Sequence, residues 1–288
     1  MPHSNSGQFR RDQRQDWESV AAGWRKWYRT FENGACKMSY KLIEMAKIKP
    51  ASNVLDIATG IGEPAITVAR CMGTGGHVLA SDISLQMLSI ARDRAIAEHL
   101  EGIMDFKEGD ASTINLSEFC FDAALCRFGL MFLDELDLGL SNIHKSLVKG
   151  GRFAASVWSI PEKVPQLALA MDTVRKELNI LSPPPLGTPG PFSLADENVL
   201  RNSFVRCGFK VMDMERLNIT FEFDSAEEYT NFTKDIAAPV LAMLADQTLD
   251  RKEQIWKAVT KEATKFVKNN TDSIVLDNEA ICIVGEKQ

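Results

Sequence analysis

The sequence predicts an α/β fold with a parallel sheet at its centre. Short apolar runs alternate with longer segments of helical apolar spacing over residues 53–158, as in strands joined by crossover helices. The first apolar run, NVLDIA, carries an acid and precedes a turn with two glycines. Ligands bind such sheets beyond the carboxyl ends of the strands, so a site is expected at this turn.

The elements follow in order along the chain. Residues 1–16 are polar and predict a disordered tail, and residues 17–50 predict two helices, the second starting at Cys36 and stopping before Pro50. Strands are expected at 53–58, 76–82, 103–110, 121–128 and 152–158, with helices at 63–72, 84–100 and 134–151. Pro64 fits a first helical turn, and Ser84 is the expected N-cap of the next helix.

Beyond residue 158 the alternation changes. Residues 159–193 predict a helix after Pro165 and a Pro- and Gly-rich loop, and residues 225–268 predict two or more helices. Both segments are expected to be insertions that cap the carboxyl edge of the sheet. Between and after these insertions, a helix and a long strand over 194–224 and a closing strand at 279–287, within 269–288, complete the core sheet.

The overall composition limits the function classes. The 288 residues are 45% hydrophobic and 25% charged, with a formal net charge of −6, which is unlike a nucleic-acid binder. No run approaches the roughly 18–20 apolar residues of a membrane span, and the polar start lacks the apolar core of a secretory signal. Six scattered cysteines indicate a reduced, cytoplasmic protein, and four histidines without ligand spacing predict no metal.

Two cofactor classes fit the glycine turn. The stretch from Gly60 to Ala65 matches G-x-G-x-x-A, and Asp82 follows Gly62 by 20 residues, as in dinucleotide-binding proteins. Asp56, however, precedes Gly60 by four residues. A carboxylate there disfavours an anionic pyrophosphate and favours the ammonium and sulfonium of S-adenosylmethionine. Glu63 is expected to act in the same direction.

The motifs resemble those of the class I S-adenosylmethionine-dependent methyltransferases. Asp56–Gly62 is similar to their first motif, D-x-x-x-G-x-G, and ASDIS, EGDAS, FDAALCRFGLMFLDE and SLVKGGRFAASVW resemble the next four in order. RFGLMF and GPFSLADENVLRNSFVRCGF are similar to segments of the small-molecule, ubiquinone/menaquinone-biosynthesis type. The resemblance implies a Rossmann-like parallel seven-stranded sheet with helices on both faces, an antiparallel last strand, N-terminal helices covering the cofactor and a helical cap.

The resemblance also implies the roles of individual residues. S-adenosylmethionine would bind the core, residues 51–158, with Asp82 on the ribose hydroxyls and Asp110 on the adenine amino group. The expected cofactor-binding residues are Asp56, Thr59, Gly60, Gly62, Asp82, Ile83, Met87, Gly109, Asp110, Ala111, Arg127 and Phe128.

No catalytic residue can be assigned from the sequence, but four candidates should lie near the methyl group. Arg127 and Phe128 follow the fourth strand, and Trp24 and Trp27 belong to an aromatic stripe whose rings could stabilise a sulfonium. Arg127 either binds an anionic substrate or is held by an acid such as Asp134 or Glu135. In-line methyl transfer depends mainly on positioning and water exclusion, so a base is not required unless the pKa of the acceptor is high.

The predicted function is methylation of a small organic acceptor. Three alternatives stay open: a quinone-ring C-methyltransferase, an NAD(P)-dependent oxidoreductase and a non-catalytic S-adenosylmethionine-binding partner protein. The acceptor and the choice between monomer and homodimer are not readable from the sequence.

Overall fold

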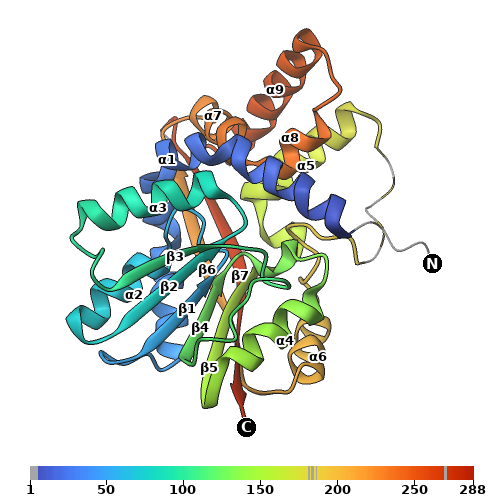
Figure 1. The fold of residues 1–288 in the computed structure, drawn as a ribbon. Helices are drawn as coiled ribbons and strands as arrows, with labels where there is room; N and C mark the ends of the chain where they lie inside the picture. The colour runs from blue at the N-terminus through green and yellow to red at the C-terminus, as the bar shows by residue number, and fades with distance from the viewer. Residues whose placement is uncertain (1–5, 181, 183–184, 186, 269–270) are drawn as a thin grey trace.

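A seven-stranded sheet forms the centre of the protein, in the order β3-β2-β1-β4-β5-β7-β6. The computed structural model describes residues 6–180, 182, 185, 187–268 and 271–288 (Figure 1). β7 runs antiparallel to both of its neighbours, whereas the remaining pairs are parallel, which confirms the predicted sheet. The strands are β1 (Asn53–Ile57), β2 (His77–Asp82), β3 (Met104–Glu108), β4 (Phe121–Arg127), β5 (Leu147–Trp158), β6 (Phe209–Phe223) and β7 (Ile274–Lys287).

Helices cover both faces and one end of the sheet. Figure 1 shows α2 and α3 on one side of the strands, α4 and α6 on the other, and α5, α7, α8 and α9 above the strand ends. Helix α1 begins above the strand ends and continues onto the sheet, where it packs on β6, β5 and β4. Among the described residues, no helix is both long and apolar enough to cross a membrane. The helices are α1 (Ser6–Met45), α2 (Ala65–Met72), α3 (Leu85–Ala97), α4 (Leu136–Ser146), α5 (Pro165–Glu177), α6 (Glu197–Arg206), α7 (Ala226–Ile236), α8 (Ala238–Met243) and α9 (Leu249–Ala263).

The central strands are apolar because both of their faces are covered. Val54 and Leu55 of β1 and Ala124 and Leu125 of β4 are all fully buried. The crossover helices α2, α3 and α4 follow the carboxyl ends of β1, β2 and β4. The Ser84 hydroxyl accepts the Met87 N–H at 3.2 Å to cap α3 as predicted. This arrangement gathers turns and helix N-termini at the carboxyl edge of the sheet.

The first helix corrects two predictions. Residues 6–16 are not a disordered tail but the first turns of α1, and the two helices expected over 17–50 are one helix of 40 residues. Gly34, which suggested a break, lies against β6, where an added Cβ would be 2.5 Å from the Thr220 carbonyl oxygen. The glycine therefore permits close packing of a continuous helix instead of ending it.

Two boundaries also differ from the prediction. The helix expected over 134–151 ends at Ser146, and residues 147–151 belong to β5. Leu147 pairs with Phe121 of β4, so sheet pairing prevails over the helical spacing there. The last strand begins at Ile274, before the predicted start at residue 279, because β6 pairs with it along its full length.

The cap predicted over the strand edge is confirmed. Helices α5, α7, α8 and α9 occupy the two insertions and pack on one another and on α1 (Figure 1). Tyr229 and Phe232 of α7 are fully buried between these helices and β6. Part of the predicted Pro- and Gly-rich loop, at 181, 183–184 and 186, lies outside the described residues.

Candidate functional site

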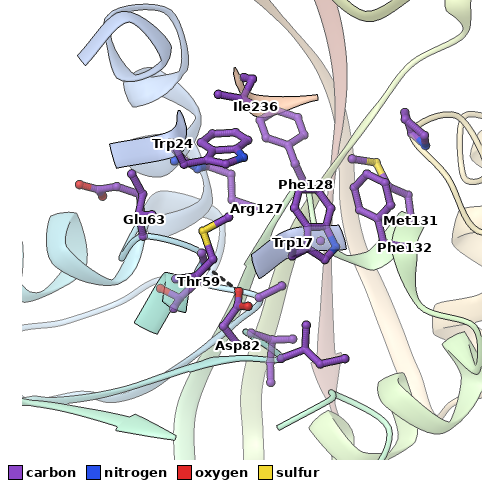
Figure 2. A pocket seen from close by; sticks show the side chains of 18 of the residues that line it. Trp17, Trp24, Thr59, Glu63, Asp82, Arg127, Phe128, Met131, Phe132 and Ile236 are labelled. Atoms are coloured by element: carbon purple, nitrogen blue, oxygen red, sulfur yellow. Dashed lines mark hydrogen bonds between the residues drawn. The ribbon is translucent and has the colours of Figure 1, made fainter. Parts of the chain in front are cut away.

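A cavity lies where the carboxyl ends of the central strands meet α1 and the cap. β1 and β4 lie side by side in the sheet, while their crossovers leave in opposite directions, so the cavity occupies the switch point at which ligands bind in such sheets. Residues from the ends of β1 to β5 line it from below, and α1, α5 and α7–α8 line it from above (Figure 2).

The backbone is strained on both sides of the switch point. Ala58 after β1 and Phe128 after β4 have positive φ angles of 56° and 60°, which are unusual for residues with a side chain. Between them, a Cβ on Gly129 would lie 2.5 Å from the Cβ of Ala58. Such strain persists where surrounding structure holds it and is concentrated at functional sites.

The two glycines of the turn serve different purposes. Gly60 has a φ of 56° and nothing within 4 Å of a Cβ built on it, so its bare backbone faces open space. Gly62 has a φ of 103°, and its Cβ would lie 2.7 Å from Ile66, so it allows α2 to pack on the turn. Gly60 lines the cavity and Gly62 does not.

Asp56 lies beneath the turn and does not itself line the cavity, contrary to its expected role as a direct contact. It is fully buried, its Oδ2 accepts the Ala65 N–H at 3.1 Å, and its Oδ1 has no partner among the described residues. Burial raises its pKa to about 7. The Thr59 hydroxyl, which does line the cavity, is also buried without a partner, so unsatisfied oxygen atoms gather at the turn.

Asp82 joins the turn to the end of β2. Its Oδ2 accepts the Gly60 N–H at 2.8 Å and its Oδ1 accepts the Ser84 N–H at 2.9 Å. Only 7% of the residue is exposed, and burial raises the pKa of the carboxyl group to about 6. The carboxylate is fixed in place with lone pairs still free, which suits ligand hydroxyls.

Asp110 occupies the corresponding position after β3. One of its oxygens accepts the Ser112 N–H at 2.8 Å and also contacts the Ser112 hydroxyl. The adjacent Ala111 carbonyl is held by the Asn142 amide at 3.0 Å. The remaining predicted cofactor residues that line the cavity are Ile83, Met87, Gly109, Arg127 and Phe128.

Arg127 is held by an acid, but not by Asp134 or Glu135. Its guanidinium makes a two-pronged ion pair with Glu32 of α1, and it also donates to the Ser39 hydroxyl at 3.0 Å. Glu135 instead pairs with Arg10 at 2.8 Å. The charge of Arg127 is therefore compensated within the protein, so it has no need of an anionic substrate.

The Glu63 carboxylate is compensated as well. Arg94 donates to it at 3.0 Å and the Thr67 hydroxyl at 2.7 Å. The expectation that Glu63 draws a cationic ligand is therefore not supported by its surroundings.

The aromatic stripe of α1 is divided between two environments. Trp17 and Trp24 line the cavity, but Trp27 does not, which is a correction to its candidacy. The Trp27 indole packs on Phe232 and donates to Asp235 at 2.7 Å, joining α1 to α7. Figure 2 shows Trp17 and Trp24 among the side chains that line the cavity.

Several lining residues were not predicted. Gln13 and Phe31 lie at helical spacings from Trp17 and Trp24, but Gln13 precedes the predicted start of the helix at residue 17. Tyr28, a member of the predicted aromatic stripe, also lines the cavity. Cavity residues without a sequence signal are Glu32, Trp158, Gln166, Leu167, Pro191, Ile236, Ala237 and Pro239. Among the described residues, no three His, Cys, Asp or Glu side chains could together hold a metal ion.

Helix α1 is tied down at both rims of the cavity. On one rim, the Gln13 amide donates to the Phe132 carbonyl oxygen at 2.6 Å and Arg10 pairs with Glu135. On the other, Arg14 pairs with Glu108 at 2.6 Å. These contacts make the first half of α1 a cover over the cavity.

Comparison with known proteins identifies the core. Residues 54–151 match a family model described as a methyltransferase domain. The ubiquinone/menaquinone biosynthesis C-methyltransferase UbiE of Rhodopseudomonas palustris is 34% identical over 119 residues, 41% of this chain and 47% of the relative. UbiE of Cellvibrio japonicus is 34% identical over 131 residues, 46% of this chain and 52% of the relative. The chain thus spans about half the length of these relatives.

Solved structures share the fold at low sequence identity. The YcgJ protein of Bacillus subtilis is similar with a TM-score of 0.58 and 18% identity, covering 88% of this chain and 98% of YcgJ. The [4+2]-cyclase SpnF has a TM-score of 0.53 at 20% identity, covering 87% of this chain and 80% of SpnF. Together with the sheet order and the motifs, the match shows that residues 54–151 are a methyltransferase domain of the class I, S-adenosylmethionine-dependent type.

Proposed function

We propose that this protein transfers a methyl group from S-adenosylmethionine to a small organic acceptor. The observation that carries the proposal is a cavity that joins the Gly60 turn, Asp82 and Asp110 to a second part under the cap. This second part, the aromatic compartment, is lined by Trp24, Phe128, Trp158 and Gln166. The methyltransferase domain supplies the class of chemistry, and α1 and the cap line the cavity from above, where they would limit the access of bulk water to a bound ligand.

The residues present fit the cofactor. Asp82 would accept the ribose hydroxyls and Asp110 the adenine amino group, while the unsatisfied Thr59 hydroxyl and the bare Gly60 backbone would receive the methionine part. Bound there, S-adenosylmethionine supplies an electrophilic methyl group on a sulfonium. Trp24 and Phe128 offer ring faces for that positive charge.

Catalysis by positioning follows from the state of the cavity carboxylates. Glu32 is bound by Arg127 and Glu63 by Arg94, and Asp82 and Asp110 would be occupied by the ribose hydroxyls and the adenine amino group. With the cofactor bound, none of the four would be left as a dedicated base. The protein would therefore accelerate transfer by holding the acceptor in line and by removing water.

Methylation of a quinone ring is the second candidate. It is favoured by the similarity to the UbiE C-methyltransferases and by the apolar lining of the compartment. Turnover of a demethylated quinone analogue, with the product methylated on ring carbon, would support it. Turnover of simple phenols or thiols with no activity on the quinone analogue would rule it out.

Replacing Asp82 with alanine is expected to weaken the binding of S-adenosylhomocysteine by about 1–3 kcal/mol, because two hydroxyls lose a charged acceptor. Calorimetric titration measures this, with NADH and NADPH titrated in parallel. Asp105→Ala, which removes an exposed acid from β3, is the matched control. Full affinity in a folded Asp82→Ala protein, or binding of a nicotinamide alone, would overturn the proposal.

The affinity for S-adenosylhomocysteine is expected to depend on pH. The pKa of Asp82, raised to about 6 by burial, makes the carboxyl neutral in acid, where it no longer accepts two ligand hydroxyls. The affinity should be constant well above pH 6 and fall about tenfold per pH unit well below it. In the Asp82→Asn variant the affinity should no longer depend on pH. A pH dependence that remains in this variant would be assigned to another group such as Asp56.

A further inference from the structure

Two polar groups in the aromatic compartment have no partner. The Gln166 side-chain oxygen and the Trp24 indole N–H are buried and make no hydrogen bond with any described residue. Both residues line the cavity, and only 3% of Gln166 is exposed. A buried polar group without a partner lowers stability, so a ligand in this cavity that offers a partner to each of the two groups would be stabilised.

Gln166 is held in place by buried neighbours. It lies in the first turn of α5, where its N–H donates to the Asn278 side chain at 2.9 Å and its carbonyl accepts the Tyr229 hydroxyl at 3.0 Å. Asn278 is fixed in turn by the Leu276 carbonyl oxygen at 2.8 Å. The sheet and the cap therefore fix the backbone of Gln166, and burial restricts the side chain that it carries.

The sheet order separates this compartment from the part of the cavity that would hold the cofactor. Asp82 and Asp110 follow β2 and β3 on one side of β1, whereas Phe128 and Trp158 follow β4 and β5 on the other. The rings of Phe128 and Trp158 stack at 4.0 Å with an angle of 11° and form a flat floor. Trp24 packs on Phe31 and also against a cluster that includes Ile61 and Met87, so it lies where the two parts of the cavity meet.

The compartment has no uncompensated charge among the described residues that line it. Arg127, its one lining guanidinium, is bound by Glu32, and Glu63 is bound by Arg94. The two acids without a cationic partner, Asp82 and Asp110, lie in the part of the cavity that would hold the cofactor. A carboxylate, phosphate or ammonium on the acceptor would lose its hydration without gaining a counter-charge.

We infer that the acceptor is uncharged and carries an oxygen function read by Gln166 and Trp24. A hydroxyl would donate to the Gln166 side-chain oxygen, and an oxygen lone pair would accept the Trp24 indole N–H. This makes Gln166 and Trp24 residues that determine acceptor specificity. The inference rests on the proposed function, since it concerns the same cavity.

The test uses the full-length protein saturated with S-adenosylhomocysteine and three probes of similar size: 2-naphthol, naphthalene and 2-naphthoate. The wild-type protein should bind 2-naphthol at least tenfold more tightly than naphthalene, and 2-naphthoate weakest of the three. Gln166→Leu should reduce or abolish the preference for 2-naphthol while leaving the affinity for S-adenosylhomocysteine unchanged. Trp24→Phe, which keeps a ring and removes the N–H, should reduce the same preference.

Stability and a matched variant separate the outcomes. Gln166→Leu removes an unpaired buried oxygen, so its melting temperature should be no lower than that of the wild type. Gln254→Leu, an exposed glutamine on α9, should change none of the affinities. Binding of S-adenosylhomocysteine with no preference for 2-naphthol, or with a preference that survives both cavity variants, overturns this inference alone. Failure to bind S-adenosylhomocysteine overturns the proposed function instead.

Discussion

Replacing Arg127 with methionine is expected to lower the free energy of unfolding by about 3–5 kcal/mol, as for other buried ion pairs that lose one member. The Arg127 side chain is only 6% exposed and Glu32 only 19%. Without the guanidinium, Glu32 keeps a largely buried charge beside apolar rings such as Phe31. Urea unfolding followed by circular dichroism measures the loss.

Two further variants show whether the loss of stability comes from the unpaired charge of Glu32. The double variant Glu32→Met/Arg127→Met should recover most of the stability, because neither charge remains buried. Arg206→Met breaks an exposed pair with Asp137, whose side chains are 55% and 53% exposed, and should cost far less stability than Arg127→Met because water screens the pair. An Arg127→Met protein as stable as Arg206→Met would show that the pair contributes little.

Replacing Gly23 with alanine is expected to cost about 3 kcal/mol, the upper end of the usual range for overpacking. A Cβ at Gly23 would lie 1.8 Å from the Asp235 carbonyl oxygen of α7 and 2.5 Å from its carbonyl carbon. Both neighbours are backbone, so α1 and α7 must separate. The gain in helix propensity of about 1 kcal/mol from alanine does not offset this.

The same change should alter the acceptor side of the cavity. Asp235 also accepts from Lys26 at 2.8 Å and from Trp27, and the next residues, Ile236 and Ala237, line the cavity. Displacing α7 should therefore raise the KM for the acceptor by a larger factor than it raises the Kd of S-adenosylhomocysteine. Gly102→Ala, with open space around its Cβ, is the control. Equal melting temperatures for the two variants would mean that α1 and α7 are not closely docked.

The sequence was informative wherever the signal is local. Strands β1 to β4 and the Ser84 cap each depend on a short run of residues, and the positions of Asp82 and Asp110 follow from the ends of those strands. The long helix α1 was missed because Gly34 resembles a break unless the neighbouring strand β6 is known.

The remaining features of the site depend on distant contacts. Arg127 pairs with Glu32, which is 95 residues away in the sequence. Of the two nearby acids, Glu135 pairs with Arg10, and Asp134 forms no ion pair with a described residue. Trp24 and Trp27 are equivalent in the helical pattern, and only the position of α7 decides which one faces the cavity. Gln166 has no sequence signal, because its importance comes from neighbours in α7 and β7.

The route of α1 also bears on how the chain reaches its native state. Phe31 packs on Phe221 of β6 with ring centres 5.2 Å apart, and the Met38 sulfur lies 3.2 Å from the Cys282 sulfur of β7. β6 itself pairs in the sheet only with β7, which is formed by residues 274–287. During synthesis the ribosome releases α1 before the two strands on which it packs. The helix therefore has to wait, with its apolar stripe exposed, until β6 and β7 have emerged.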